Sequence, residues 1–431
     1  MANKKMLMIT YLFPPRGGGG VQRNVKFLKY LTRLGWETSV LTVKETGINL
    51  YDSTLLDEIN SNIFRAGSFD PHRVFAKLKN IFGKSKPHSF NQSFSKIDEN
   101  VWYVRFYRKV RDVILLPDVY GGWIPFAVAL GRKLIKTTRP DILFCSFPWP
   151  SNAFVTYILS KKFNIPYVLD FRDGWIDNPY TLYSSILHRR FHEYYERKIV
   201  ANADKIIVYG EILRDFFVMK YPVLRDKIEV ITNGFDPEDF DDLRPVAKTE
   251  NKVRLVYSGF AFGDRRENFI NFLEALCIVS EFIQTKLEII FVGKKLKWAQ
   301  EAVELKKLEK TINFTGYLPH KEALNYLASA DAALLFLPKG DTVSITGKVF
   351  EYIGFRLPII ACIEKNGACA RLLKSVNHDQ GVCDPSHPEE IADKIELLVN
   401  SGLPKLNNVN MTQFSRKVHS ERLSRILEEI V

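Results

Sequence analysis

The chain has 431 residues, which exceeds one ordinary domain and suits two α/β domains of about 200 residues each. Hydrophobic residues make up 46% and charged residues 26% of the sequence, which excludes a largely disordered chain. The net charge of +12 favours anionic partners such as phosphorylated substrates or anionic lipids. The sequence contains neither zinc-finger spacing nor a long basic arm, so we expect no binding to nucleic acid.

The cysteines and the apolar runs indicate in which cellular compartment the protein is found. The five cysteines form no C-x-x-C pair, which is typical of a reducing compartment and gives no metal-ligand pattern. Pro14 and Pro15 interrupt the N-terminal apolar run too early for a signal peptide, and the longest apolar runs, such as 332–337, have the length of a strand. We therefore expect a cytoplasmic protein, and the cysteines give no sign of a metal site. Our interpretation of the function also predicts no cofactor.

Short apolar runs alternate with helical patterns along nearly the whole chain. Most runs are β-branched or aromatic without alternation, as in parallel strands buried on both faces. Strands are predicted at 7–11, 38–43, 142–145, 167–171, 205–208 and 228–231, and then at 254–257, 287–292, 312–314, 332–337 and 358–361. A helix over 21–34, capped by Gly35, follows the first strand. This alternation predicts an α/β fold with two Rossmann-like, doubly wound parallel sheets.

An acidic, proline-containing stretch over 236–251 predicts the boundary between two domains. After it, residues 253–259 restart the strand-then-glycine pattern of the N-terminus. We predict a first, acceptor-side domain over 1–240, a second domain over 241–405, and a C-terminal helix within 406–431 that packs back on the first domain. Residues 46–100 lack periodicity and are rich in Ser, Asn and Lys, so we expect an insertion or acceptor-side loop there.

A basic amphipathic pattern over 72–88 leaves two interpretations open. It contains five basic residues and no acid, and its apolar residues fall on one helical face. Such a helix can lie on an anionic membrane, or it can cover the first domain as a solvated helix. The first interpretation makes the protein peripheral at the inner face of the cell membrane and favours a lipid-linked acceptor.

A glycine loop, residues 17–20, joins the first predicted strand to the first predicted helix. Glycines allow backbone N–H groups to approach an anion, and the helix N-terminus adds positive potential, so the loop suits a phosphate. A flexible turn is the alternative. The loop does not match the dinucleotide-binding motif G-x-G-x-x-G, because Gln22 stands where the third glycine is required. Gly347 and Lys348, further along the chain, do not belong to a P-loop, because Val349 follows them where the motif requires Ser or Thr.

Charged residues lie at the end of the predicted strand 167–171, where parallel sheets bind their ligands. A carboxylate at this place can act as a general base or orient a hydroxyl acceptor. We favour Asp173 for this role and Asp170 as a bracing partner. The alternative is that Arg172 and its neighbouring carboxylates only brace the loop.

A third motif begins a helix after the predicted strand 332–337. The hydroxyls of Ser344 and Thr346, the backbone at Gly347 and the charge of Lys348 suit a diphosphate. Glu351, one turn further, can accept both ribose hydroxyls. The alternative is an ordinary glutamate that the helix dipole favours.

Together these motifs resemble the family-four group of glycosyltransferases with the GT-B fold, in which two Rossmann-like domains face each other across a cleft. The resemblance extends over the whole chain and is specific through the order and spacing of its motifs. They are F-P-P-x-x-G-G-G (13–20, with Gly17 at the second x), D-F-R-D-x-W (170–175), I-T-N-G-F-D (231–236), Y-S-G (257–259), F-V-G (291–293), F-T-G-Y (314–317) and G-K-V-F-E-Y (347–352), followed by Pro358.

The resemblance implies that a nucleotide sugar binds mainly to the second domain. Glu351 matches the ribose-binding glutamate, and the turn at Gly316 and Tyr317 flanks the base. The donor-binding set is Gly18, Gly19, Gly259, Arg266, Lys294, Gly316, Tyr317, Ser344, Thr346, Gly347, Lys348 and Glu351. The catalytic set is Asp173, Arg172 and Arg265, with either Arg265 or Arg266 on the diphosphate.

Two departures from the family pattern concern the transferred sugar. Many members carry two glutamates separated by seven residues, and the first position here is Val343. Arg172 and Asp173 stand where many members have a histidine near the reacting sugar. The resemblance still predicts a metal-independent glycosyltransferase of the hexosyltransferase type, which uses a nucleoside diphosphate sugar and a glycan or lipid-linked acceptor in bacterial surface-polysaccharide biosynthesis. The alternatives are an epimerase or phosphorylase of the same fold, or a non-catalytic nucleotide-binding protein.

Overall fold

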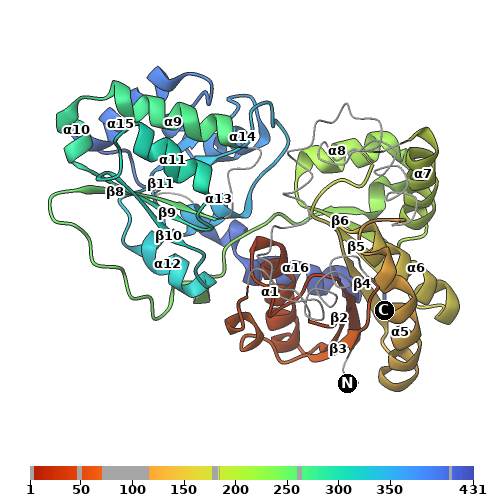
Figure 1. The fold of residues 1–431 in the computed structure, drawn as a ribbon. Helices are drawn as coiled ribbons and strands as arrows, with labels where there is room; N and C mark the ends of the chain where they lie inside the picture. Colours follow the sequence, from red (N-terminus) through yellow and green to blue (C-terminus); the bar gives the residue numbers. More distant parts are fainter. Residues whose placement is uncertain are drawn as a thin grey trace, which may run out of the picture. The chain divides into compact units, whose positions relative to one another are not determined.

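The computed structural model describes residues 4–45, 51–69, 116–176, 183, 185–259, 265–406 and 410–431 (Figure 1). The chain divides into two compact units, one of Met1–Arg16, Gly20–Ile231 and Ser420–Val431, the other of Gly17–Gly19 and Thr232–His419. The divisions at 231 and 419 differ from the predicted 240 and 405. Phe235 stacks on Phe240, which packs against Phe355, so these aromatic residues join the core of the second domain.

The first sheet has seven parallel strands in the order β3-β2-β1-β4-β5-β6-β7. They are β1 (Lys5–Ile9), β2 (Glu37–Val43), β3 (Asn62–Ala66), β4 (Ile142–Ser146), β5 (Tyr167–Phe171), β6 (Lys205–Val208) and β7 (Ile228–Val230). The strand β3 lies within the stretch 46–100, for which the sequence predicts no strand. The order reverses between β1 and β4, and ligands of such sheets bind at the carboxyl ends of the strands at this switch point.

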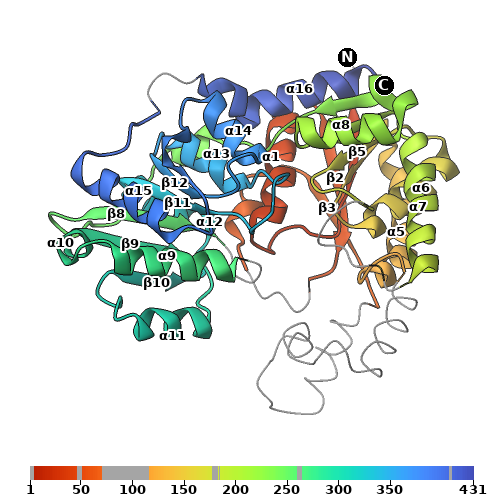
Figure 2. The same cartoon turned by 90° about the horizontal axis from the view of Figure 1, so that it is seen from above.

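Helices cover both faces of the first sheet (Figure 2). One face carries α1 (Gly19–Arg33) and α16 (Arg416–Glu428), and the other carries α5 (Ile124–Thr138), α6 (Pro150–Phe163), α7 (Ile186–Ala201) and α8 (Glu211–Lys220). Leu423 and Leu427 of α16 are buried in the same core as Met6 and Met8 of β1. The C-terminal helix therefore completes the first domain.

The second sheet repeats this pattern with six parallel strands in the order β10-β9-β8-β11-β12-β13. They are β8 (Val253–Ser258), β9 (Leu287–Val292), β10 (Ile312–Gly316), β11 (Ala332–Phe336), β12 (Ile359–Cys362) and β13 (Val382–Cys383), of which β13 is not predicted from the sequence. One face carries α9 (Arg266–Ile278), α11 (Lys297–Leu305) and α15 (Pro388–Asn400), and the other carries α12 (His320–Ala328), α13 (Gly347–Gly354) and α14 (Ala368–Ser375). The short α10 (Glu281–Thr285) precedes β9.

The sequence predicts that no helix crosses a membrane and that a basic helix over 72–88 can lie on one. Within the described part of the chain, no helix is both long and apolar enough to cross a bilayer. The predicted basic helix over 72–88 lies outside the described residues.

Candidate functional site

Three neighbouring strands of the second sheet end in glycines with positive φ. These are Gly259 (φ +133°) after β8, Gly293 (φ +158°) after β9 and Gly316 (φ +92°) at the end of β10. A Cβ atom at Gly259 would overlap the side chain of Lys348, and one at Gly293 would overlap the carbonyl oxygen of Gly259. The glycines therefore allow the Lys348 side chain to lie directly against the end of β8.

Two cations from separate elements converge on one buried tyrosine. Lys348, in the first turn of α13, donates from Nζ to the Tyr257 hydroxyl at 2.7 Å, and its ammonium lies 4.1 Å from the centre of that ring. Arg265, which precedes α9, donates to the same hydroxyl at 3.4 Å. This group lies at the carboxyl end of β8, next to β11, where the strand order reverses. It therefore occupies the expected ligand position of the second sheet.

The pKa values of this group reflect its positive charge. Burial lowers the pKa of the Lys348 ammonium, and the nearby Arg265 guanidinium adds to the lowering while Tyr257 opposes it. Burial alone would raise the pKa of the Tyr257 phenol, but the Lys348 and Arg265 charges outweigh it and lower that pKa. An anion bound here would relieve the repulsion between the two cations.

Tyr352 holds α13 in place across the switch point. Its hydroxyl accepts a hydrogen bond from the backbone N–H of Ser258 at 3.1 Å and donates to the carbonyl of Leu334 at 3.2 Å. Since Ser258 ends β8 and Leu334 belongs to β11, one side chain ties the helix to both strands. Lys348 and Glu351 are thereby positioned on a rigid element.

Glu351 has a histidine partner that the sequence does not reveal. The His320 Nε2 lies 3.0 Å from a Glu351 carboxylate oxygen, and Asp239 lies 3.9 Å from the other ring nitrogen. Because an ionised carboxylate only accepts hydrogen bonds, His320 Nε2 is the donor. This bond orients the carboxylate and leaves it further capacity to accept from hydroxyl groups.

The other predicted donor residues differ in their local contacts. The backbone N–H of Ser344 donates to Asp341 at 2.9 Å, and Thr346 precedes α13 without a capping bond from its hydroxyl. Gly347 begins the helix. Arg266 is exposed and lies over the Trp298 ring, 5.0 Å from its centre, whereas Arg265 reaches Tyr257.

The remaining predicted residues occupy loops at strand ends. Lys294 is exposed just after β9, and Tyr317 is partly buried just after Gly316. In the glycine loop, Gly18 has φ +102° and Gly19 begins α1. Val343, at the position of the missing glutamate, has 38% of its surface exposed.

In the first domain, Asp170 pairs with a residue that the sequence does not indicate. It forms a fully buried salt bridge of 2.8 Å with Arg23 of α1. Arg23 also donates to the carbonyl of Ile231 at 2.9 Å. Asp170 thus has a structural role, and the predicted bracing of this loop comes from the first helix.

The neighbouring Arg172 and Asp173 differ in their contacts. Arg172 donates to the carbonyl of Phe147 at 2.7 Å and also to that of Gly20, so it links the loops after β4 and β5 to α1. The Asp173 side chain has solvent-accessible surface, but the protein atoms around it desolvate its charged form, which raises its pKa to about 6 against the opposing Arg172 charge. A carboxylate with this pKa is suited to take a proton near neutral pH.

Helix α7 supports the loop that carries Asp173. The Trp175 indole donates to His192 Nδ1 at 2.9 Å, and the backbone N–H of Ile176 donates to the buried Glu196 at 2.9 Å. Burial and the nearby His188 lower the pKa of His192 to about 4, so its ring is neutral and can accept the indole hydrogen. These contacts between distant residues carry no local sequence signal.

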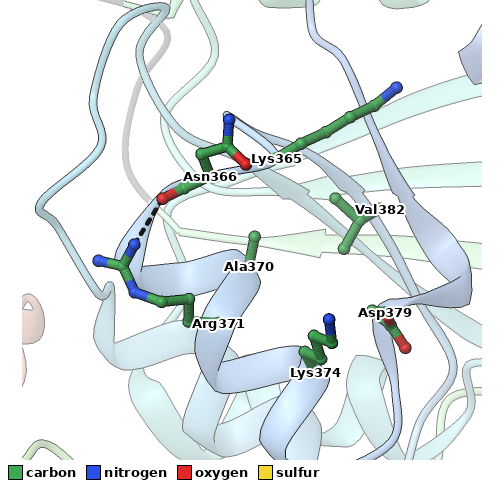
Figure 3. Close-up of a pocket in the computed structure, with 7 residues that line it drawn as sticks. All are labelled: Lys365, Asn366, Ala370, Arg371, Lys374, Asp379 and Val382. Carbon is green, nitrogen blue, oxygen red and sulfur yellow. Dashed lines mark hydrogen bonds between the residues drawn. The ribbon is translucent and has the colours of Figure 1, made fainter.

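A separate cavity of about 410 Å³ lies beside α14 in the second domain (Figure 3). Its lining includes the exposed cations Lys365, Arg371 and Lys374. Lys365 pairs with Glu390 at 2.7 Å, and Arg371 donates to the carbonyl of Asn366 at 2.6 Å. None of the predicted site residues lines this cavity.

Family models match both halves of the chain. Residues 17–239, more than half of the sequence, match the model described as Glycosyltransferase Family 4. The chain belongs to glycosyltransferase family 4. Residues 240–417 match the model described as glycosyl transferases group 1. The predicted family, and glycosyl transfer as its activity, are therefore confirmed.

Solved structures agree on the fold. A glycosyltransferase from Rickettsia africae ESF-5 has a TM-score of 0.64 at 16% identity and covers 100% of this chain and 99% of its own. A sucrose-phosphate synthase from Thermosynechococcus elongatus has a TM-score of 0.65 at 13% identity, with 99% of each chain covered. A putative UDP-N-acetylglucosamine 2-epimerase from Listeria monocytogenes has a TM-score of 0.60 at 9% identity, over 99% of this chain and 96% of its own. A comparison with curated protein sequences found no match. At these identities the likenesses show the fold alone, and the predicted pair of Rossmann-like domains of the GT-B type is confirmed.

Proposed function

We propose that this glycosyltransferase moves a sugar from a nucleoside diphosphate sugar to a hydroxyl group of a glycan or lipid-linked glycan in polysaccharide biosynthesis. The observation that carries the proposal is the convergence of Lys348 and Arg265 on the buried hydroxyl of Tyr257. Two cations held together at a strand end form a site for a diphosphate. Glu351, one helical turn from Lys348, accepts the ribose hydroxyls.

Positive charge beside the diphosphate has a chemical function. In the transfer, the bond between the anomeric carbon and the phosphate oxygen breaks, and its electron pair leaves with the diphosphate. Lys348, Arg265 and the N-terminus of α13 stabilise this developing charge in the manner of an oxyanion hole. Arg266 and Lys294 are additional cations for the phosphates. The protein thereby supplies the charge that a metal ion supplies in other transferases.

The first domain supplies the acceptor half of the reaction. A bond forms between the acceptor oxygen and the anomeric carbon, and the acceptor proton passes to the Asp173 carboxylate. A pKa of about 6 keeps Asp173 ionised at neutral pH and able to accept this proton. Arg172 positions the loop through Phe147 and Gly20. A lipid-linked acceptor would make the enzyme peripheral at the cytoplasmic face of the membrane.

A thermal-shift titration tests the donor class. UDP, GDP, ADP, dTDP and CMP and their common sugar conjugates are added to the wild type and to Glu351→Ala. A ligand at about 100 times its dissociation constant adds roughly 2.7 kcal/mol, which is several degrees for domains of this size. We expect one nucleotide to shift the wild type and the substitution to remove the shift. If no nucleotide shifts the protein, the proposed donor is wrong.

An acceptor-dependence assay separates transfer from the epimerase alternative. With the donor identified, a transferase consumes it in proportion to an added glycan, whereas an epimerase converts it without any acceptor. Conversion of the donor to an isomer in the absence of acceptor would contradict the proposal.

A further inference from the structure

Three polar side chains form a row beside the start of α12 in the second domain. Asp239 lies in a short 3₁₀ helix (Pro237–Phe240), His320 is the first residue of α12, and Glu351 lies in α13. The His320 Nε2 is 3.0 Å from a Glu351 carboxylate oxygen, and its Nδ1 is 3.9 Å from an Asp239 oxygen. The side chains of Asp239, His320 and Glu351 are 16%, 14% and 15% exposed. The imidazole therefore lies between two carboxylates and is largely covered.

Close packing fixes the three elements that carry this row. The Phe240 ring packs against that of Phe355 with ring centres 4.4 Å apart. A Cβ atom at Gly354 would overlap the Phe240 ring, so this glycine allows the 3₁₀ helix to approach the end of α13. Leu327 of α12 and Phe350 of α13 are buried in one core. The imidazole and the Glu351 carboxylate are thus held by elements that pack together.

The bond from His320 restricts a side chain that could otherwise turn. The torsion that rotates a glutamate carboxylate is broad, because it joins an sp³ to an sp² carbon. His320 holds one oxygen of Glu351, Oε1, and the structure gives the other, Oε2, no hydrogen bond among the described residues. Each carboxylate oxygen has two acceptor sites. Oε2 therefore keeps both sites for hydroxyl groups, in a plane that His320 determines.

Two neighbouring hydroxyl groups match this arrangement. A ribose presents such a pair, whereas a 2′-deoxyribose offers only one of them. Glu351 follows Lys348 by three residues, which is about 4.5 Å along the helix axis. The ribose and the diphosphate of one nucleotide can therefore contact α13 at the same time.

We propose that His320 is a positioning residue for the donor, and that its Nε2–H holds the Glu351 carboxylate in the orientation that accepts the ribose hydroxyls. Asp239 attracts the imidazole from its other side and opposes its rotation. This inference rests on the proposed function and specifies how the ribose of the donor is recognised. The preference for ribose over 2′-deoxyribose then depends on a residue that does not itself touch the nucleotide.

Paired calorimetric titrations of the full chain test this role. UDP, GDP and ADP are each compared with their 2′-deoxy counterparts, and the readout is the ratio of the two dissociation constants. For the base that it binds, the wild type should prefer the ribonucleotide about 10-fold. In His320→Ala the ribonucleotide should weaken about 3- to 10-fold and the deoxynucleotide about 2-fold or less, because the carboxylate is no longer held. His320→Gln, whose amide N–H can reach the same oxygen, should restore most of the ratio.

His387→Ala is the matched control, because this histidine lies in the same domain and also pairs with a carboxylate, that of Asp384, at 3.5 Å. Its side chain is 60% exposed, and the variant should keep the wild-type ratio. In a Glu351→Gln background, His320→Ala should cause no further loss of ribose preference, because the two residues act as a pair. A role of His320 in folding alone would weaken both nucleotides equally and leave the ratio unchanged, which would overturn the inference.

The same titrations separate this inference from the proposed function. Equal binding of ribonucleotide and deoxynucleotide by the wild type would overturn the ribose contact and leave donor binding intact. A wild type that prefers ribose, with the same preference in His320→Ala, would overturn the role of His320 alone. If no nucleotide binds the wild type, the proposed function is wrong and this inference fails with it.

Discussion

The two domains share one topology and differ in the chemistry that lies on it. Both sheets have the order 3-2-1-4-5-6 in their own strand numbering, with a seventh strand at one edge of the first. At the switch point of the second sheet, Lys348 and Arg265 surround a tyrosine hydroxyl. At that of the first, aromatic rings lie beyond the ends of β1 and β4, and an exposed carboxylate, Asp173, follows the neighbouring β5. The fold determines where ligands bind, and the side chains determine which ligands they are.

The two sites are also held by different means. In the second domain, glycines at three strand ends and the Tyr352 hydroxyl allow close packing of α13. In the first, the loop after β5 depends on the buried pair of Arg23 and Asp170 and on contacts with α7. The first site should therefore be sensitive to loss of charge in its core, whereas the second should be sensitive to substitution of its strand-end glycines or of Tyr352.

The largest expected effect concerns Asp173. Removing a general base costs about 10²- to 10⁴-fold in rate, so Asp173→Asn should lower kcat by that amount and leave nucleotide binding unchanged. Because the pKa of Asp173 is about 6, the wild-type rate should be flat above this pH and fall about tenfold per pH unit below it. The measurement is a pH–rate profile at saturating donor. An unchanged rate for Asp173→Asn would remove this residue from the mechanism.

The buried pair in the first domain predicts a stability difference between the domains. Arg23→Met leaves Asp170 as an uncompensated buried charge, which should cost about 3–5 kcal/mol. Hydrogen exchange should show the loss in the first domain and little change in the second. Arg214→Met is the control, since its exposed pair with Asp215 should contribute within about 1 kcal/mol. Equal losses in both domains would contradict the assignment of this pair to one core.

The proposed ribose contact of Glu351 predicts an effect confined to the second domain. Glu351→Gln would remove the charge that strengthens the proposed bonds to the ribose hydroxyls, so donor affinity should fall roughly 10- to 100-fold. The wild type should bind a ribonucleotide more tightly than its 2′-deoxy counterpart, and the variant should bind them almost equally. Calorimetric titration with both nucleotides measures this. Full discrimination retained by Glu351→Gln would place the ribose elsewhere.

The smallest expected effect is that of a chelator. Since the proposed function assigns the positive charge at the diphosphate to Lys348 and Arg265, transfer should be unchanged by EDTA and by added Mg²⁺ or Mn²⁺. Initial rates with and without these additions provide the check. A rate that disappears with EDTA and returns with a divalent cation would show that the cations of the second domain are insufficient.

The sequence predicts the central strands well and the edge strands poorly. Strands such as β5 and β9 are largely buried and apolar except for one carboxylate each, Asp170 and Glu288, and their predicted bounds match those observed. The two missed strands, β3 and β13, lie at sheet edges. The former contains Asn62 and Arg65 and the latter has only two residues, so neither carries a continuous apolar signal.

The sequence suggests the candidate site one motif at a time, but it does not reveal the contacts within that site. Lys348 and Glu351 are predicted from the start of a helix, whereas nothing in the sequence assigns a role to Tyr257, 91 residues from Lys348. His320 also carried no signal for its contact with Glu351, because the contact arises only when α12 and α13 pack on the same sheet face. Arg265 and Arg266 are neighbours in sequence, and only the start of α9 determines which of them reaches Tyr257.

Calorimetric titration of Lys348→Met tests the central claim most directly. The ligands are the nucleoside diphosphate that gives the largest thermal shift and the corresponding nucleoside. Lys339→Met is the control, because this exposed lysine pairs with Glu267 away from Tyr257. The account predicts that Lys348→Met weakens the diphosphate about 10- to 100-fold, that the nucleoside is unaffected, and that the control behaves as wild type. Unchanged diphosphate affinity in Lys348→Met would contradict the assignment of this site to the donor.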